Sequence, residues 1–192
     1  MKELVMASTN AGKIREIKHL LPHIHLLSLQ DIAFTDTIEE PFETFEENAF
    51  IKANTIYNKI QKPVFADDSG ICVTSLNDAP GVHSAYYSGE RNDEANLQKV
   101  LQLLGDNTQR AAYYKAVICL IWQGQPHYFT GICHGKIALQ KAGNEGFGYD
   151  PIFIPDGFDQ TFGALPLDIK NEISHRGKAI KQMIDFINKL SA

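Results

Sequence analysis

Two adjacent carboxylates follow directly on an apolar run, and this pairing constrains the fold more than any other feature. Val64-Phe65-Ala66 reads as a buried strand, and Asp67-Asp68-Ser69-Gly70 comes next, at the predicted strand end. A carboxylate withdrawn from water takes up a proton or finds a counter-ion. Oxygen ligands at a junction between strand and turn suit Mg²⁺, which prefers one or two carboxylates plus substrate phosphates. The segment therefore predicts a metal site or, alternatively, an Asx turn capped by Gly70.

The bulk composition is that of a globular protein with a substantial core. The 192 residues are 44% hydrophobic and 10% aromatic, which fits one domain over residues 1–192 and excludes disordered and fibrous classes. The formal net charge of -5 argues against a nucleic-acid partner, because nucleic-acid binding would need Lys and Arg clustered on one face. An anionic substrate would have to be met by a few placed cations or by a metal.

The sequence also predicts the compartment. The first residues turn polar by Ser8 without the apolar core of a signal peptide, and the apolar stretch 116–122 is far too short to span a bilayer. Cys72, Cys119 and Cys133 are odd in number and lack CxxC spacing, so we expect buried, reduced thiols. We therefore predict a soluble, cytoplasmic protein with no membrane partner.

The first third of the chain reads as strand, loop, helix and strand. Residues 4–7 form an apolar run, and residues 8–13 are polar. Apolar residues then recur with helical spacing at Ile14, Ile17, Leu20 and Leu21. Pro22 ends this helix, and residues 25–29 form a plausible second strand.

A capping box opens the next helix. Thr44 and Glu47 have the required spacing, and Lys52 lies beside the apolar stripe behind them. That stripe consists of Phe45, Ala49, Ala53, Ile56 and Ile60. Residues 64–66 and 71–73 are predicted as short strands on either side of the carboxylate turn.

The second half of the chain adds helices and a pair of strands. Helical spacing predicts helices over 93–104, with Gly105 as terminator, and over 176–190, with Leu190 facing inward. Residues rich in β-branched and aromatic side chains predict strands over 110–122 and 127–139, joined by the loop 123–126. Crossover-like and hairpin strands together predict an α/β fold around a mixed sheet.

Four polar segments follow predicted strands, where ligands gather in α/β proteins. They are residues 8–13, 67–70, 146–150 and 170–177. In the first segment, helix-start amides and Lys13 would suit a phosphate, although the P-loop spacing is missing. The alternative is Asn10 as a helix cap with a solvated Lys13.

The other two segments could recognise a planar base. Gly146-Phe147-Gly148-Tyr149-Asp150-Pro151 could stack a ring and bond its edge, or form a bulged turn with packed aromatics. Ser174-His175-Arg176 could read a carbonyl or bind an anion, or be a capping Ser with solvated neighbours. Together the four segments describe a nucleoside triphosphate site.

The motifs in these segments and elsewhere along the chain resemble those of a known family, the inosine triphosphate pyrophosphatases. The motifs that carry the resemblance run in order over nearly the whole chain: Ser8-x-Asn10-x-x-Lys13, Glu47-Asn48-Ala49-x-x-Lys52-Ala53, Ala66-Asp67-Asp68-Ser69-Gly70, Pro80-Gly81, Gly146-Phe147-Gly148-Tyr149-Asp150-Pro151 and Ser174-His175-Arg176.

The resemblance implies hydrolysis of the non-standard purine triphosphates ITP, dITP and XTP to monophosphate and pyrophosphate with Mg²⁺, which clears deaminated purines from the nucleotide pool. It implies a homodimer. It also implies a long, curved mixed β-sheet flanked by helices in two lobes, with the active site in the cleft between them.

Roles carry over position by position. Asp68 would be general base and metal ligand, Asp67 would support it, and Glu40 would be the second metal ligand, with Glu39 and Glu43 left open. The remaining implied contacts are with substrate: Ser8, Thr9, Asn10, Ala11, Gly12, Lys13 and Lys52 with the triphosphate, Ser69 with the substrate, Phe147, Gly148, Tyr149 and Asp150 with the base, and Lys170, His175 and Arg176 with a phosphate or the 6-oxo group.

One departure and two rival functions stand beside this interpretation. The family commonly has Arg where this chain has Tyr86, so a contact made by that Arg is in question. A pyrophosphatase for pyrimidine or modified triphosphates would differ in its base pocket. A nucleotide-sensing module would bind without turnover, which the intact pair Asp67-Asp68 disfavours.

Overall fold

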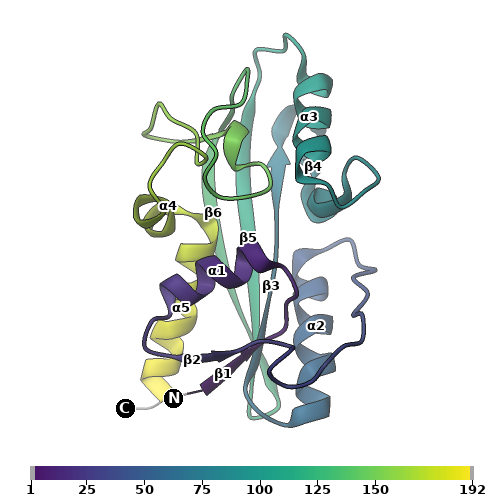
Figure 1. Cartoon of the computed structure of the whole chain (residues 1–192), viewed down its shortest axis with the longest axis vertical. Coiled ribbons are helices and arrows are strands. Elements are labelled where there is room, and N and C mark those ends of the chain that lie inside the picture. The colour runs from purple at the N-terminus through teal and green to yellow at the C-terminus, as the bar shows by residue number, and fades with distance from the viewer. Residues whose placement is uncertain (1–2, 191–192) are drawn as a thin grey trace. The chain divides into compact units, whose positions relative to one another are not determined.

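The computed structural model describes residues 3–190, which contain both helices and strands (Figure 1). The strands are β1 (Glu3–Met6), β2 (His25–Leu27), β3 (Val64–Val73), β4 (Ala79–Pro80), β5 (Ala111–Trp122), β6 (Gln125–Ile137) and β7 (Phe153–Pro155). The α-helices are α1 (Ala11–Leu20), α2 (Phe45–Ile60), α3 (Asp93–Leu104), α4 (Leu167–Ile173) and α5 (His175–Leu190). Short 3-10 helices cover Thr74–Leu76, Gly81–Tyr86 and Asp150–Ile152.

The strands of residues 3–190 form one mixed sheet in the order β2-β1-β3-β5-β6-β7, and β4 pairs with β3. β1 runs parallel to both β2 and β3, with Glu3 opposite His25 and Val5 opposite Val64. β4 is antiparallel to β3, and β7 is antiparallel to β6. The predicted α/β fold, a mixed sheet flanked by helices, is confirmed.

The chain divides into two compact units, each assembled from separate stretches of sequence. The first contains the described residues up to Asp68, Ala116–Gly131 and the stretch from Arg176 onward. The second contains Ser69–Lys115 and Ile132–His175. The single domain over residues 1–192 stays a prediction.

Helices cover both faces of the strands in the first unit. Leu4, Met6 and Phe65 are at most 1% exposed and pack in one cluster with residues of α1 and α5. The intervening Val5 and Ala66 are equally buried on the other face, where α2 lies (Figure 1). A strand that is covered on both faces reads as a continuous apolar run, which is why β3 begins Val64-Phe65-Ala66.

The second unit has its own core, and aromatic rings dominate it. Phe153 meets Tyr114 edge-on at a centroid distance of 4.9 Å and meets Phe162 at 5.1 Å. Leu97 and Val100 of α3 close the same cluster. The spacing that predicted α3 therefore places its apolar face correctly.

The capping signals read from the sequence are confirmed. The Asn10 side chain accepts from the backbone N–H of Lys13, so α1 begins where the polar loop predicts. Thr44 Oγ1 accepts from the N–H of Glu47 in the same way and donates its hydroxyl hydrogen to the Glu47 carboxylate, so these two residues cap α2. Gly105 ends α3 with a positive φ of 45°.

The carboxylate turn is the main correction to the fold. Residues 64–66 and 71–73 are not two short strands, because β3 runs without interruption through Asp67-Asp68-Ser69-Gly70. The Asx turn is therefore wrong as well. Gly70 keeps the strand extended against its neighbours, since a Cβ there would stand 2.1 Å from the Gly81 carbonyl oxygen.

Smaller boundaries also differ from the prediction. The loop between β5 and β6 is the two-residue turn Gln123-Gly124, whose positive φ values of 50° and 77° suit a tight hairpin. β2 ends at Leu27, short of the predicted 29. Leu190 is 48% exposed rather than inward, because α5 reaches the edge of its cluster there. The short helix α4 was not predicted.

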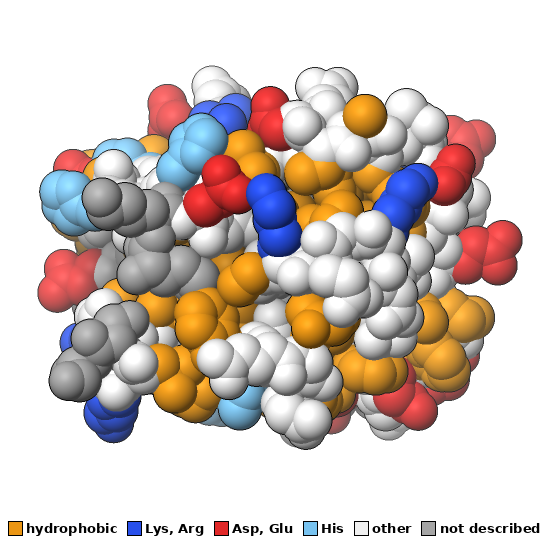
Figure 2. Space-filling view, turned by 90° about the horizontal axis from the view of Figure 1, so that it is seen from below, with side chains coloured by type: hydrophobic (Ala, Val, Ile, Leu, Met, Phe, Trp, Pro, Cys, Tyr) orange, Lys and Arg blue, Asp and Glu red, His pale blue; other side chains and the backbone are white. Residues whose placement is uncertain are grey.

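The surface and the cysteines agree with the composition. Figure 2 shows one face of the molecule, on which Lys and Arg side chains lie scattered among acidic, His and apolar ones. The three cysteines are buried and free, as predicted. None of the helices within residues 3–190 combines the length and the apolar character needed to cross a membrane.

Candidate functional site

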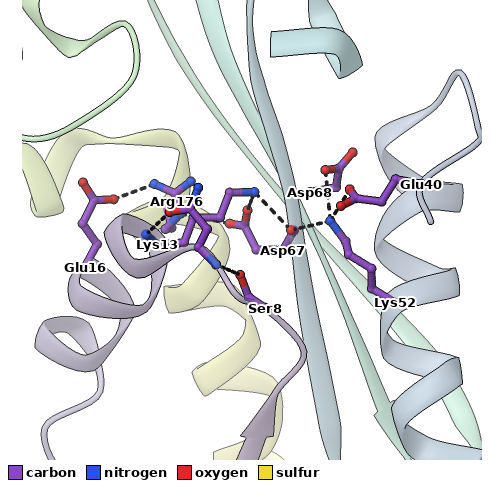
Figure 3. Close-up of polar contacts among 9 residues, drawn as sticks. Ser8, Lys13, Glu16, Glu40, Lys52, Asp67, Asp68 and Arg176 are labelled. Atoms are coloured by element: carbon purple, nitrogen blue, oxygen red, sulfur yellow. Dashed lines mark hydrogen bonds and ion pairs between the residues drawn. The ribbon is translucent and has the colours of Figure 1, made fainter. Parts of the chain in front are cut away.

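Asp67 and Asp68 point to opposite faces of β3, because successive side chains of a strand alternate. Phe65 faces α1 and α5, so Asp67, two residues on, faces them too. Ala66 faces α2, and Asp68 follows it. Figure 3 shows the consequence: the two carboxylates do not share one cation, and each has its own set of partners.

On the first face, Asp67 binds two cations. Its Oδ1 lies 2.6 Å from Lys13 Nζ, and its Oδ2 accepts from Arg176 Nε at 3.0 Å. Arg176 Nη1 in turn bonds Glu16 Oε2 at 2.5 Å. Burial alone would raise the pKa of Asp67, but Arg176 and Lys13 outweigh it and hold that pKa well below its usual range. Asp67 is therefore ionised at neutral pH.

The charges of its two partners respond differently to burial. For Lys13, burial outweighs the attraction of Asp67, so its pKa lies below the ordinary value for lysine. For Arg176, the neighbouring Asp67 and Glu16 outweigh burial and raise the pKa further. The positive charge of Arg176 is therefore held more strongly than that of Lys13.

On the second face, Lys52 gathers three oxygens. Its Nζ donates to Glu40 Oε2 at 2.6 Å, to the Asp67 backbone carbonyl at 3.0 Å and to Asp68 Oδ1 at 3.2 Å. Lys13 Nζ also donates to the Asp67 carbonyl, at 3.2 Å. The two ammonium groups therefore meet at one backbone oxygen of β3 (Figure 3).

The carboxylates around Lys52 differ in basicity. Burial, reinforced by Glu40, raises the pKa of Asp68 against the pull of Lys52. Burial would also raise the pKa of Glu40, but Lys52 outweighs it and lowers the net value. Asp68 Oδ2 is buried and has no hydrogen-bond partner. An orphaned, basic carboxylate oxygen fits a proton acceptor or a metal ligand.

The residues fit a divalent cation, although not as a preformed cluster. Among residues 3–190, no three His, Cys, Asp or Glu side chains lie together as a ready metal site. Of the three glutamates that the sequence left open, Glu40 is the one that Lys52 links to Asp68. The oxygen chemistry of Asp68 and Glu40 suits Mg²⁺.

The predicted phosphate residues lie in the loop before α1 and in the first turn of that helix: Ser8, Thr9 and Asn10 in the loop, and Ala11, Gly12 and Lys13 in the helix. Ser8 Oγ accepts from the Asn10 N–H at 3.2 Å, and Asn10 Oδ1 accepts from the Lys13 N–H at 3.0 Å. These bonds fix the loop at the N-terminus of a ten-residue helix, where backbone amides favour an anion. The alternative is half right, because Asn10 is a cap, but Lys13 is paired rather than solvated.

In the second unit, Asp150 organises the predicted base residues. Its Oδ2 accepts from Lys170 Nζ at 2.6 Å and from the Phe147 N–H at 2.8 Å. Gly146, with φ at 78°, gives this carboxylate room, since a Cβ there would lie 2.0 Å from Oδ2. The Lys170 ammonium also lies 5.4 Å from the centroid of the Phe147 ring.

The glycine-rich turn is itself well packed. Tyr149 is buried and donates to the Ser84 carbonyl at 2.8 Å, while Phe147 and Gly148 are half-buried. The turn therefore has packed aromatics, as the alternative predicted. Phe147 nevertheless keeps part of its surface exposed, so a planar ring of a ligand can still reach it. Ser69 of β3 is half-buried too.

His175 and Arg176 are adjacent in sequence but belong to different units. Both are at most 3% exposed, so the prediction of solvated neighbours after Ser174 is wrong. His175 stacks on Tyr114 with 4.4 Å between ring centroids and 4° between planes. The proposed contacts of Ser69, Lys170, His175 and Arg176 with substrate stay predictions.

Comparison with known proteins identifies the family of this chain. The model of the Ham1 family matches residues 4–186. The chain belongs to the Ham1 family. A relative from Christiangramia forsetii named dITP/XTP pyrophosphatase is 49% identical over 189 residues, which are 97% of this chain and 100% of that protein. The predicted family resemblance is thereby confirmed.

Solved structures of Ham1 proteins show the same fold. The Staphylococcus aureus Ham1 protein has a TM-score of 0.88 at 40% identity, over 98% of this chain and 99% of that one. A HAM1 protein from Coxiella burnetii has a TM-score of 0.89 at 38% identity, over 98% and 100% of the two chains.

Two residues with a role near the site of this Ham1 family chain, Glu16 and Asn48, were not predicted from the sequence, and a third, Tyr86, departs from the family pattern. Glu16 is buried on α1 and pairs with Arg176, which also pairs with Asp67. Its position next to Ile17, on the apolar side of a predicted helix, indicates a buried carboxylate that needs a cation. Asn48 bonds both the N–H and the carbonyl of Phe42 and so ties the loop that carries Glu40 to α2. Tyr86 is 55% exposed, with the Arg91 guanidinium 5.7 Å from its ring.

Proposed function

We propose that this chain hydrolyses the non-standard purine nucleoside triphosphates ITP, dITP and XTP to the monophosphate and pyrophosphate. One observation carries the proposal: Lys13 and Lys52 converge on the backbone oxygen of Asp67, while the adjacent Asp68 keeps an unpaired, buried oxygen. Membership of the Ham1 family and the name of the Christiangramia forsetii relative support the choice of substrate.

The triphosphate would bind at the N-terminus of α1. The amides of Thr9, Ala11 and Gly12 would meet phosphate oxygens, and Lys13 and Lys52 would neutralise the departing pyrophosphate. Burial lowers the pKa of Lys13 and so disfavours its charged form. A phosphate beside the ammonium group would stabilise that charged form, which suits Lys13 to this role. Asp67 would act by holding Lys13 in place.

Asp68 and Glu40 would hold Mg²⁺, as their oxygens and the orphaned Oδ2 allow. When bound, the ion would polarise the phosphate and offset its charge. Asp68 would also accept the proton of a water that attacks the α-phosphorus in line with the leaving pyrophosphate. Its raised pKa makes it a better base than an ordinary aspartate.

The base would be recognised by the residues around Asp150. Phe147 would stack on the purine, Gly148, Tyr149 and Asp150 would shape the pocket, and Ser69 would touch the substrate. Lys170, His175 and Arg176 would place donors toward a phosphate or the 6-oxo group. Adenine has an amino group there and would leave buried donors unpaired, at a cost of roughly 1 to 3 kcal/mol each.

Hydrolysis of deaminated purine triphosphates would keep them from polymerases, so the proposed biological role is to clean the nucleotide pool. We further propose that the chain acts as a homodimer in the cytoplasm. Light scattering after size exclusion would test the dimer, and a monomeric mass would contradict it.

A substrate panel tests the proposal. Pyrophosphate and orthophosphate release would be measured from ITP, XTP, GTP, ATP, dTTP and UTP, with Mg²⁺ and with a chelator. We expect metal-dependent pyrophosphate from ITP and XTP, and little from ATP. Turnover of the pyrimidines would favour a pyrimidine pyrophosphatase, and tight binding without release would favour a nucleotide sensor.

A further inference from the structure

The Lys52 ammonium group fills the space between the two carboxylates proposed to hold the metal. Its Nζ lies 2.6 Å from Glu40 Oε2 and 3.2 Å from Asp68 Oδ1, and the Asp67 carbonyl at 3.0 Å is its third acceptor. An ammonium has three N–H donors, so each can have one acceptor here. We propose that Lys52 is an internal stand-in for the divalent cation and leaves the carboxylates when that cation binds.

Charge explains why a stand-in is needed. Asp68 has a side chain that is 8% exposed, and a buried carboxylate without a cation is costly. Lys52 supplies that cation whenever no metal is bound. The Lys52 ammonium, which reaches the site from α2, offsets the repulsion between the carboxylates of Asp68 and Glu40. The two carboxylates can therefore remain close together in the protein without ligand.

Charge also explains why Lys52 has to leave. A divalent ion between Asp68 and Glu40 would stand within a few ångströms of the ammonium, and the two positive charges would repel each other. The flexible four-carbon stem of lysine allows the ammonium to move. Glu40, with 43% of its side chain exposed, marks the solvent side of the cluster, whereas the Asp68 side chain is buried.

The displaced Lys52 would then be available to a phosphate oxygen. This part of the inference rests on the proposed function, because it takes Asp68 and Glu40 as the metal ligands. It gives Lys52 two successive partners: the carboxylates before the cation binds, and the pyrophosphate group of the substrate afterwards.

Lysine labelling of the wild-type protein tests the displacement without any turnover. The protein would be treated briefly with acetic anhydride, with and without Mn²⁺ and in the absence of nucleotide, and each lysine would be quantified by mass spectrometry. We expect labelling of Lys52 to rise several-fold with Mn²⁺. Lys59, 53% exposed on the same helix, is the internal control and should not change. Unchanged or reduced labelling of Lys52 would overturn the proposal.

Direct metal binding gives a second, independent readout. Free Mn²⁺ would be measured by electron paramagnetic resonance for wild type, Lys52→Met and the control Lys59→Met. Removal of the competing charge should tighten Mn²⁺ binding by about tenfold or more in Lys52→Met, with no change in the control. Equal or weaker binding, or no binding by any of the proteins, would overturn the proposal. If Lys52→Met does not fold, the wild-type labelling decides. If the protein releases pyrophosphate from ITP but Mn²⁺ does not change the labelling of Lys52, the proposed hydrolysis is supported and the proposed displacement of Lys52 is wrong.

Discussion

Replacement of Arg176 by methionine should destabilise the first unit strongly. Arg176 is 2% exposed and bonds two carboxylates that are equally buried, those of Asp67 and Glu16. The Arg176→Met variant would take the guanidinium away from both Glu16 and Asp67. Removal of one partner from a buried ionic network costs about 3 to 5 kcal/mol, because the remaining charge stays desolvated.

That loss is large relative to the stability of a typical protein, which is about 5 to 15 kcal/mol. Urea unfolding followed by circular dichroism would measure it, and the midpoint of thermal unfolding should fall by about 6 to 20 °C. A control variant, Lys141→Met, breaks the exposed pair of Lys141 with Glu94 and should change little.

A double variant checks the physical reason for the loss. Glu16→Met combined with Arg176→Met should lose less than the sum of the two single losses, because each change removes the charge that the other leaves behind. A loss below about 1 kcal/mol in Arg176→Met would refute the reasoning, since a desolvated carboxylate cannot remain at so small a cost.

Three further predictions follow from single contacts. The stability advantage of wild type over Asp67→Asn should be fully present above about pH 4 and should shrink at lower pH. The reason is that the pKa of Asp67 is lowered in the folded protein, so the unfolded chain takes up a proton first as the pH falls. Urea titrations of both proteins at several pH values would measure this difference. Asn48→Ala should free the loop that carries Glu40 and weaken Mn²⁺ binding without loss of α2, so unchanged binding would contradict the positioning role. Gly70→Ala should cost about 1 to 3 kcal/mol in urea unfolding, since its Cβ would meet the Gly81 carbonyl at 2.1 Å, and a stable variant would show that β3 can shift there.

Local signals in the sequence were sufficient for most elements of the fold. Helix α2 shows why: Thr44 and Glu47 are only three residues apart, so this N-terminal cap depends on nothing beyond its own turn. The termination of α3 by Gly105 is equally local, since only a positive φ is required.

The carboxylate segment could not be predicted locally, because what decides its conformation is distant in sequence. An Asp-Asp-Ser-Gly run favours a turn when taken alone. Lys13 and Arg176, 54 and 109 residues away, neutralise Asp67, and Lys52 neutralises Asp68, so the strand can continue through two buried charges. Tertiary ion pairs overrode the turn propensity.

The same limit applies to the candidate site. Motif order identified Lys13, Lys52 and Asp68, because the family resemblance carries residue identities. It could not show that the two aspartates face opposite sides of one strand, which follows only once the segment is known to be extended. Nor could it find Asn48 as the tie of the Glu40 loop, since that role depends on the path of the loop.

The most direct test of the proposed chemistry is hydrolysis of ITP in water enriched in oxygen-18, with the products separated and weighed by mass spectrometry. Attack at the α-phosphorus predicts one labelled oxygen in the monophosphate and unlabelled pyrophosphate, and Asp68→Asn should lose most of this turnover. Label in pyrophosphate, release of orthophosphate, or wild-type turnover by Asp68→Asn would contradict the account.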